Sequence, residues 1–270
     1  MLFKLILFIA IGVDRVHHCL GYELVTRYSE TQDKHSRLGI FHGHVTTIQK
    51  HPYLVAILNN GSFYCAGTIV NDHWIVTSAD CANNFDGTTT IVAGSSDGLT
   101  GSSFIINSVV LHPNYGSSIL DYDYACVQIV GKFKWSKKTK AIHLPKKEPK
   151  VNTTMTVAGW GDDEVAGRVG ERAPNPHLLQ GTMTWVDKQI CNSTYSWAGL
   201  TWTDRMACAY NRGKTTLCSG DWADAFVHKG VFYGQFLAGG SGFCNSNAQP
   251  LILADIYQVV SWIKQITGTK

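Results

Sequence analysis

Three short patterns in this sequence contain side chains that hydrolases use. Gly94-Ser95-Ser96-Asp97-Gly98 matches G-x-S-x-G, which supplies a nucleophile only on a strand–elbow–helix turn. Ser261-Trp262-Ile263-Lys264 matches S-x-x-K. We interpret both as chance matches, because the first falls between predicted strands and the second on a terminal helix. The carboxylates of Asp80 and Asp123 could share a proton, as in aspartic proteases, if the fold places them together.

Histidine and cysteine, the other common catalytic and ligating residues, form no recognisable site in the sequence. The 11 histidines are scattered, and we interpret His73 and His112 as structural. No C-x-x-C pair occurs, and no His lies at zinc-ligand spacing from a Cys. We therefore expect no metal and no cofactor.

The composition indicates a loop-rich β protein. Hydrophobic residues make up 44% of the chain and charged residues 16%, with 26 Gly and 8 Trp. The formal net charge of +3 is too small to give a field for nucleic acid, so we exclude nucleic acid as a partner. The length suits one large β domain or two small barrels.

The N-terminal residues have the features of a secretory signal. Lys4 gives a basic start, residues 5–13 are apolar, and Gly21 offers a small residue for cleavage before Tyr22. A membrane span needs roughly 20 apolar residues, so we predict a signal peptide over residues 1–21 and no membrane anchor. Residues 22–39 suit a short propeptide. Of the 8 Cys, Cys19 would leave with the signal, and export favours disulfides among the others, with one thiol left free.

Short apolar runs separated by turn residues follow. They cover residues 53–58, 67–77, 104–111, 124–130 and 155–159, a pattern typical of an all-β sandwich or barrel. Only residues 256–267 have helical periodicity, with Gly268 as a stop signal.

A basic segment over residues 131–151 lies between the two halves of the chain. Its only acid is Glu148, and Pro145 and Pro149 prevent regular structure. Its lysines are Lys132, Lys134, Lys137, Lys138, Lys140, Lys146, Lys147 and Lys150. We interpret this basic segment as a solvated connector that could also steer an acidic partner.

Several ordered motifs resemble those of chymotrypsin/trypsin-like (S1 family) serine proteases, from Ile40 to the C-terminus. In chain order they are Ile40-Phe41-His42-Gly43, Cys65-Ala66-Gly67, Trp74-Ile75-Val76-Thr77-Ser78-Ala79-Asp80-Cys81, Asp121-Tyr122-Asp123-Tyr124-Ala125, Gly159-Trp160-Gly161, Cys218-Ser219-Gly220-Asp221-Trp222-Ala223-Asp224 and Val260-Ser261-Trp262-Ile263. The resemblance implies an all-β fold of two six-stranded antiparallel barrels with a C-terminal helix. The S1-like domain would span residues 40–270, with barrels at about 40–145 and 151–270 and the site between them.

The resemblance also implies the cysteine pairing. It joins Cys65 to Cys81, Cys191 to Cys208 and Cys218 to Cys244. The remaining Cys126 is then a free thiol, which we interpret as a small buried hydrophobe.

At the catalytic positions that the resemblance implies, the side chains differ from the family's. Acyl transfer needs a hydroxyl nucleophile, an imidazole base, a carboxylate that orients the base, and donors for the oxyanion. Trp222 stands at the nucleophile position and Asp80 at the base position, so only Asp123 survives. Gly220 is a remnant of the oxyanion hole, beside Ala223-Asp224 in place of Gly-Gly. We expect no proteolysis.

The substrate pocket and the activation site differ as well. Thr216 replaces the trypsin pocket aspartate, Leu251 a pocket-wall glycine, and Leu237-Ala238 the Ser-Trp of the substrate-pairing strand. In the family, cleavage after Arg or Lys frees the amine of the residue at Ile40, which pairs with the aspartate at Asp221. Here Gly39 precedes Ile40, so we expect no activation by tryptic cleavage.

The combined losses resemble mite group 3 allergens and especially the inactivated serine protease paralogues of the scabies mite. That resemblance implies a monomeric, secreted pseudoprotease in the gut lumen that binds host or other extracellular proteins and inhibits complement or related defence proteins. The alternative is an acid-dependent hydrolase with an Asp80/Asp123 dyad. Sequons make Asn60, Asn152 and Asn192 candidates for N-glycosylation.

Overall fold

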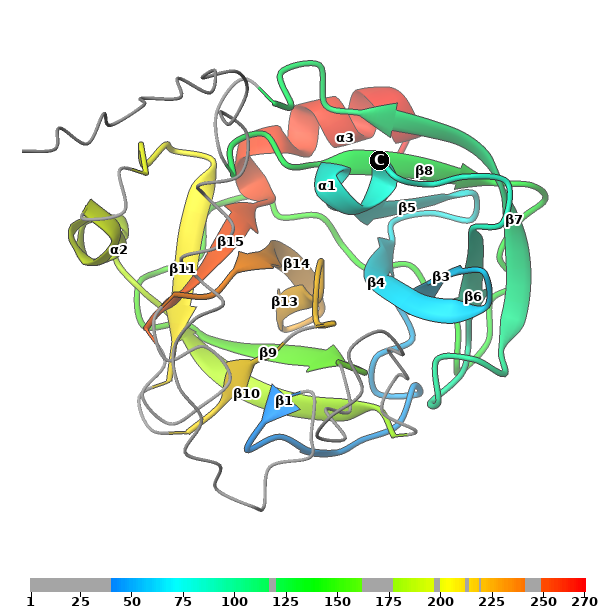
Figure 1. Cartoon of the computed structure of the whole chain (residues 1–270), viewed down its shortest axis with the longest axis horizontal. Coiled ribbons are helices and arrows are strands. Elements are labelled where there is room, and N and C mark those ends of the chain that lie inside the picture. The colour runs from blue at the N-terminus through cyan, green and yellow to red at the C-terminus, as the bar shows by residue number, and fades with distance from the viewer. Residues whose placement is uncertain are drawn as a thin grey trace, which may run out of the picture. The chain divides into compact units, whose positions relative to one another are not determined.

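The first half of the chain forms a closed, six-stranded antiparallel barrel (Figure 1). Its strands are β3 (Leu54–Asn59), β4 (Ser62–Ile69), β5 (Trp74–Thr77), β6 (Thr90–Ala93), β7 (Ser102–Leu111) and β8 (Ala125–Ile129). They follow the order β3-β4-β5-β8-β7-β6, and pairing of β3 with β6 closes the ring. The structure, a computed structural model, describes residues 40–116, 120–161, 177–196, 200–211, 214–218, 220–240 and 249–270.

The second half forms another six-stranded antiparallel ring. Its strands are β9 (Thr154–Gly159), β10 (Leu179–Trp185), β11 (Met206–Tyr210), β13 (Ala225–His228), β14 (Val231–Ala238) and β15 (Leu251–Asp255). They run in the order β11-β15-β14-β13-β9-β10, and β10 pairs with β11 to close the ring. The short β2 (His44–Val45) joins the edge at β10, and β1 (Ile40–Phe41) pairs with β12 (Thr216–Leu217). The prediction of two six-stranded barrels is confirmed.

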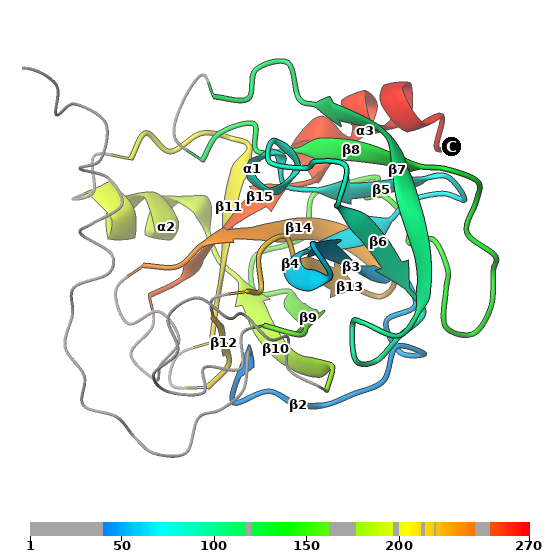
Figure 2. The same cartoon turned by 45° about the vertical axis from the view of Figure 1, so that its right-hand side comes forward.

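The helices agree with the sequence pattern only in part. The C-terminal helix is confirmed as the turn η2 (Tyr257–Val259) and α3 (Val260–Thr267), which lies beside β8 in both views (Figures 1 and 2). It ends at Gly268, whose φ of 69° is left-handed and whose N–H bonds to the Lys264 carbonyl. The prediction of a single helix was wrong, because α1 (Ala79–Ala82) and α2 (Lys188–Tyr195) also form. α2 buries only Cys191 and Tyr195, so it has no apolar stripe to detect.

One predicted strand, over residues 67–77, was also wrong as a single element. It comprises the end of β4 and all of β5, which pair with each other. Between them, the side-chain oxygen of Asn71 accepts hydrogen bonds from the backbone N–H groups of His73 and Trp74. This side-chain turn reverses the chain without the Gly or Pro that the pattern search depends on.

Buried polar bonds join the two barrels. The hydroxyl of Tyr124, which is completely buried, donates to the carbonyls of Arg205 (3.0 Å) and Asp255 (2.9 Å). Gln235 on β14 donates from its side-chain nitrogen to the carbonyls of Thr77 (3.1 Å) and Asp123 (2.9 Å). These bonds cross from one barrel to the other, so they fix the position of one barrel against the other.

The cysteines of the described residues pair as the resemblance implies. Disulfides join Cys65 to Cys81 and Cys191 to Cys208, and Cys126 is a buried free thiol. Cys218 is also disulfide-bonded. Cys244, the signal peptide of residues 1–21 and the propeptide of residues 22–39 lie outside the described residues.

The basic segment is anchored, and its charges point outward. Phe133 and Ile142 are buried, and their N–H groups donate to the carbonyls of Asp72 (2.8 Å) and Ile69 (2.9 Å). All eight lysines of the segment are exposed, and none forms an ion pair with a described residue. The segment therefore presents its positive charge from a fixed backbone.

We predict that Tyr124→Phe destabilises the protein without changing its fold. The substitution removes the shared donor of the buried Asp255 carbonyl and of the Arg205 carbonyl, which keeps the N–H of Asp255, and we expect a loss of about 1–3 kcal/mol in the free energy of unfolding. Urea unfolding followed by circular dichroism measures it. Tyr257→Phe is the control, since Tyr257 is 37% exposed and should change stability by less than about 0.5 kcal/mol. Equal effects of the two substitutions would contradict the barrel-joining role of Tyr124.

Candidate active site

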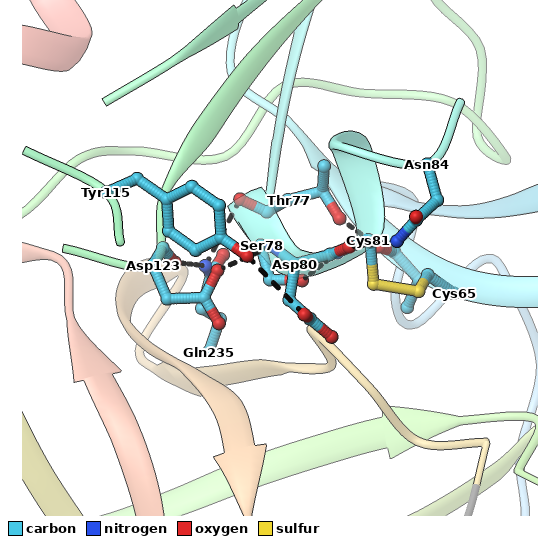
Figure 3. The surroundings of a disulfide bond; sticks show 10 residues. Cys65, Thr77, Ser78, Asp80, Cys81, Asn84, Tyr115, Asp123 and Gln235 are labelled. Carbon is cyan, nitrogen blue, oxygen red and sulfur yellow. Dashed lines mark hydrogen bonds between the residues drawn. A yellow bond between two sulfur atoms is a disulfide. The ribbon is translucent and has the colours of Figure 1, made fainter. Parts of the chain in front are cut away.

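Asp80 lies in the first turn of α1, beside the junction of the barrels (Figure 3). The Ser78 hydroxyl oxygen caps this helix by accepting a hydrogen bond from the N–H of Cys81 (3.2 Å). The Cys65–Cys81 disulfide ties the same helix to β4. The cap and the disulfide together fix the position of Asp80.

The structure brings Asp80 and Asp123 together, but not through their carboxyl groups. Asp123 is 5% exposed, and its Oδ1 accepts a hydrogen bond from the backbone N–H of Asp80 (2.8 Å). The exposed Asp80 carboxylate instead receives a long hydrogen bond from the Tyr115 hydroxyl (3.4 Å), and Figure 3 shows this carboxylate turned away from that of Asp123. Among the described residues, no hydrogen bond links the two carboxyl groups.

The environment of Asp123 favours its neutral form. Burial raises its pKa to about 6, with a further rise from the charge of Asp80. Hydrogen bonds from the N–H groups of Asp80 and Ala79 act in the opposite direction. Asp123 is therefore a carboxyl group that titrates in mild acid, held by backbone donors and with no imidazole beside it.

Gln235 is a site residue that sequence reasoning missed. It is completely buried on β14, and its bond to the Asp123 carbonyl fixes the backbone of that residue. Figure 3 shows its side chain beneath Asp123. The available signal was one amide side chain within the otherwise apolar or small residues of Val231–Ala238.

Trp222, which the sequence resemblance assigns to the nucleophile position, has its aromatic ring packed between the barrels. Its carbonyl accepts a hydrogen bond from the N–H of Ala66 (2.9 Å), which fixes the backbone against the first barrel. The indole stacks on Phe236, with ring centres 5.2 Å apart and planes 5° from parallel. It packs against the apolar clusters of both barrels. Because an indole carries no nucleophilic oxygen, this position cannot form an acyl-enzyme.

The residues beside Trp222 have unusual backbone angles. Gly220 has a φ of 86°, which glycine adopts easily, whereas Ala223 has a φ of 64°. An alanine in this left-handed region costs roughly 1 kcal/mol. The N–H of Ala223 donates to the Phe236 carbonyl (3.0 Å), so the strained residue is held by a backbone bond. The turn keeps its shape although a side chain has been added.

The four residues that the resemblance assigns to the substrate pocket lie in or beside the second barrel. Thr216, Leu237 and Leu251 are 2%, 6% and 0% exposed, and Ala238 is half-buried. Leu251 belongs to the apolar cluster of the second barrel, as does Phe236. These side chains are thus part of a packed interior.

A second pair of acids, Asp221 and Asp224, meets in the same turn and was not foreseen as a pair. Both are completely buried, and Asp221 Oδ2 accepts a hydrogen bond from the N–H of Cys218 (2.9 Å). Burial raises the pKa of Asp224 well above its ordinary value, and the charge of Asp221 and a hydrogen bond with it add to the rise. Ile40 is completely buried on β1, and its partner in β12 is Leu217.

The G-x-S-x-G and S-x-x-K patterns lie outside the structural settings that would give them catalytic roles. Ser96 follows β6 in a loop, where its hydroxyl oxygen accepts a hydrogen bond from the N–H of Ile48 (3.0 Å). Ser261 and Lys264 are exposed on α3. Within the described ranges, no group of three His, Cys, Asp or Glu residues is placed to hold a metal ion. The helices of those ranges include none long and apolar enough to cross a membrane.

Comparison with known proteins gives a consistent set of relatives. The chain is 28% identical to Trypsin 5G1 of Aedes aegypti over 84% of each chain. It is 29% identical to Trypsin Blo t 3 of Blomia tropicalis over 79% of this chain and 80% of that one. A crystal structure of the scabies mite inactivated protease paralogue S-D1 matches with a TM-score of 0.71 at 23% identity, over 84% of this chain and 97% of that one.

The family assignment follows from the extent of the match. The family model described as Trypsin matches residues 40–263, a range that includes both barrels and the first half of α3. Within it lie Asp80, Asp123 and Trp222, at the junction described above. The chain belongs to the trypsin family.

Proposed function

We propose that this chain is a proteolytically inactive member of the trypsin family that acts by binding other proteins. The observation that carries the proposal is the indole of Trp222, stacked on Phe236 at the position where the family has its nucleophile. Loss of a complete triad lowers turnover by roughly a million-fold. The likeness in fold to a scabies mite inactivated protease paralogue supports the proposal.

The contacts of Asp80 and Asp123 support the same conclusion. A carboxylate at Asp80 is a weaker base than imidazole at neutral pH, and it points to Tyr115 rather than to the Trp222 turn. A dyad that shares one proton needs the two carboxyl groups within hydrogen-bonding distance. Asp123 instead uses Oδ1 to bind the Asp80 backbone. The geometry thus favours inactivity over the acid-dependent hydrolase.

We extend the proposal to the partner. The resemblance to the scabies mite paralogues implies host defence proteins, complement components among them, as the class to be tested. The binding face we propose is the basic segment, whose eight lysines are exposed on an anchored backbone. Val130 and Trp135, at 53% and 50% exposure, add apolar area beside those lysines. An exposed Trp among positive charges suits an acidic protein surface with an apolar centre.

The test of inactivity is a hydrolysis assay on protein that starts at Ile40, with peptide and ester libraries between pH 3 and pH 9. We expect no cleavage at any pH. Cleavage confined to acid, and lost in Asp80→Asn, would instead support the dyad. Cleavage at neutral pH would overturn the proposal.

Restoring the two lost side chains should not restore an enzyme. We predict that Trp222→Ser with Asp80→His has a kcat/KM at least about a hundredfold below that of an active trypsin, because Leu251 and Thr216 still pack inside the second barrel. Trp222→Ser alone is the matched control and should show no activity. Thermal unfolding checks that both variants fold, since loss of the indole also removes packing. Trypsin-like turnover by the double variant would contradict the prediction.

Asp123→Asn should stabilise the protein at neutral pH. The folded pKa of Asp123, about 6, lies above that of an unfolded aspartate, so the folded state favours the protonated form. Its contribution to stability is therefore full in acid and is lost as the pH rises from about 4 to about 6. We expect Asp123→Asn to gain about 1–3 kcal/mol over the wild type at pH 7.5 and little at pH 4. A gain that is independent of pH in urea unfolding would contradict this account.

Charge reversal tests the binding face. We predict that changing Lys137, Lys138, Lys146 and Lys147 to Glu slows association with the partner at least about tenfold at low salt, and that salt weakens wild-type binding. Surface plasmon resonance against purified complement components measures both effects. Trp222→Ala is the matched control at the candidate active site. Binding that survives the reversal but fails with Trp222→Ala would place the binding face at the candidate active site.

A further inference from the structure

The turn that carries Trp222 contains two aspartates whose side chains are not accessible to solvent. Asp221 and Asp224 are both completely buried, and the N–H of Asp224 bonds to the carbonyl of Asp221 (3.1 Å), so residues 221–224 form one tight turn. We call these residues the 221–224 turn. Two ionised carboxylates buried there would lose their hydration, and their charges would also repel each other.

The Asp224 carboxyl group is set into the wall of the second barrel. It lies over Gly159 of β9, so closely that a Cβ on this glycine would come within 1.8 Å of Asp224 Oδ2. Neither oxygen of Asp224 accepts a hydrogen bond from a described N–H or O–H donor. A carboxyl group without donors is satisfied by becoming a donor itself, which requires a proton.

Among the described residues, the groups that face Asp224 offer no positive charge to replace this proton. Asp221 faces it from the same turn, and Tyr53, which precedes β3, faces it closely enough for the charge of Asp224 to raise the tyrosine pKa. Tyr53 in turn bonds to His51, whose pKa is lowered, chiefly by burial. β9 and β14 meet the turn with Gly159 and Phe236, which do not titrate.

The backbone nitrogen of Ile40 on β1 supplies no charge either. Ile40 follows Gly39 in the sequence, so its nitrogen is an uncharged amide as long as the chain is uncut. Its side chain is nevertheless completely buried, and its strand pairs with β12. The segment has its packed position without a free amine.

We propose that a proton shared between Asp221 and Asp224 holds the 221–224 turn in place in the uncut chain. The turn then takes the conformation described above without cleavage before Ile40. Asp224 donates the proton, and Asp221 accepts it while its Oδ2 keeps the N–H of Cys218. No covalent bond changes. The inference concerns how the turn is held, and it stands independently of whether the chain lacks proteolytic activity.

The shared proton makes the stability of the folded protein depend on pH, with a defined sign. A group whose pKa is higher in the folded state stabilises the fold in acid, and this contribution is lost as the pH rises from the unfolded value toward the folded one. For one proton, the unfolding constant of the wild type should rise relative to that of Asp224→Asn by up to about tenfold per pH unit above pH 4. The amide of Asn donates a hydrogen bond at every pH, so the variant lacks this dependence.

The first experiment is thermal and urea unfolding of the wild type, Asp224→Asn and Asp204→Asn between pH 4 and pH 8. Asp204 is exposed and is the control for removing one negative charge. We expect Asp204→Asn to follow the wild type and Asp224→Asn to diverge from it with pH. Infrared spectra at pH 7.5 should contain a protonated carboxyl band that is lost in Asp224→Asn. A constant difference between wild type and Asp224→Asn across this range, or absence of the band, would overturn the proposal.

The second experiment exchanges the proton for an amine. Asp224→Gly leaves Asp221 alone, and we expect a lower Tm and faster hydrogen exchange at the 221–224 turn. An enteropeptidase sequence placed directly before Ile40 then allows cleavage that frees the Ile40 ammonium. In Asp224→Gly, this cleavage should restore the Tm and the slow hydrogen exchange of the turn. If uncleaved Asp224→Gly has the Tm and the hydrogen-exchange protection of the wild type, the proposal of a shared proton is refuted. If this variant fails to fold, Asp224→Asn decides the question alone.

Discussion

Backbone hydrogen bonds hold the 221–224 turn without involving the side chain of residue 222. The N–H of Ala66 binds the Trp222 carbonyl, the N–H of Ala223 binds the Phe236 carbonyl, and the N–H of Asp224 binds the carbonyl of Asp221. None of these bonds requires a particular side chain at residue 222. The same backbone bonds can therefore form with a tryptophan at residue 222 within the trypsin-family fold.

Packing and solvation decide what the side chains around Trp222 do. The indole of Trp222 stacks on Phe236 and contacts the apolar clusters of both barrels, so it adds apolar contact where an enzyme needs an open oxygen. Asp80 turns its carboxylate outward to Tyr115, and Gln235 fixes the backbone of Asp123 from below. These contacts are the basis of the proposal that the chain is proteolytically inactive.

Local motifs carried much of what could be predicted from the sequence. The segments around Asp80, Asp123 and Trp222 are contiguous, so their order along the chain carried the family resemblance, and the resemblance implied two barrels with those residues between them. Gly268 gave the end of α3 because a left-handed residue is a local requirement. The turn at Asn71 was missed because an amide side chain, not Gly or Pro, reverses the chain there.

Contacts across the fold could not be predicted in the same way. Asp221 and Asp224 are visible in the sequence as two acids, but only the packing of the turn against Gly159 removes solvent from both. Gln235 reaches Asp123 from another strand of another barrel, and nothing in the local pattern specifies that pairing. The sequence hypothesis named Asp80 and Asp123 as the acid pair that shares a proton, whereas the structure also buries Asp221 and Asp224 in one turn, where the charge of Asp221 adds to the raised pKa of Asp224.

The central claim is that residue 222 provides no nucleophile, and covalent labelling tests it most directly. The protein that begins at Ile40 is incubated with a fluorophosphonate, with active trypsin as the positive control, and its intact mass is measured. The account predicts an unmodified mass under conditions that label trypsin completely. A stoichiometric adduct that maps to the peptide containing Trp222 would contradict it.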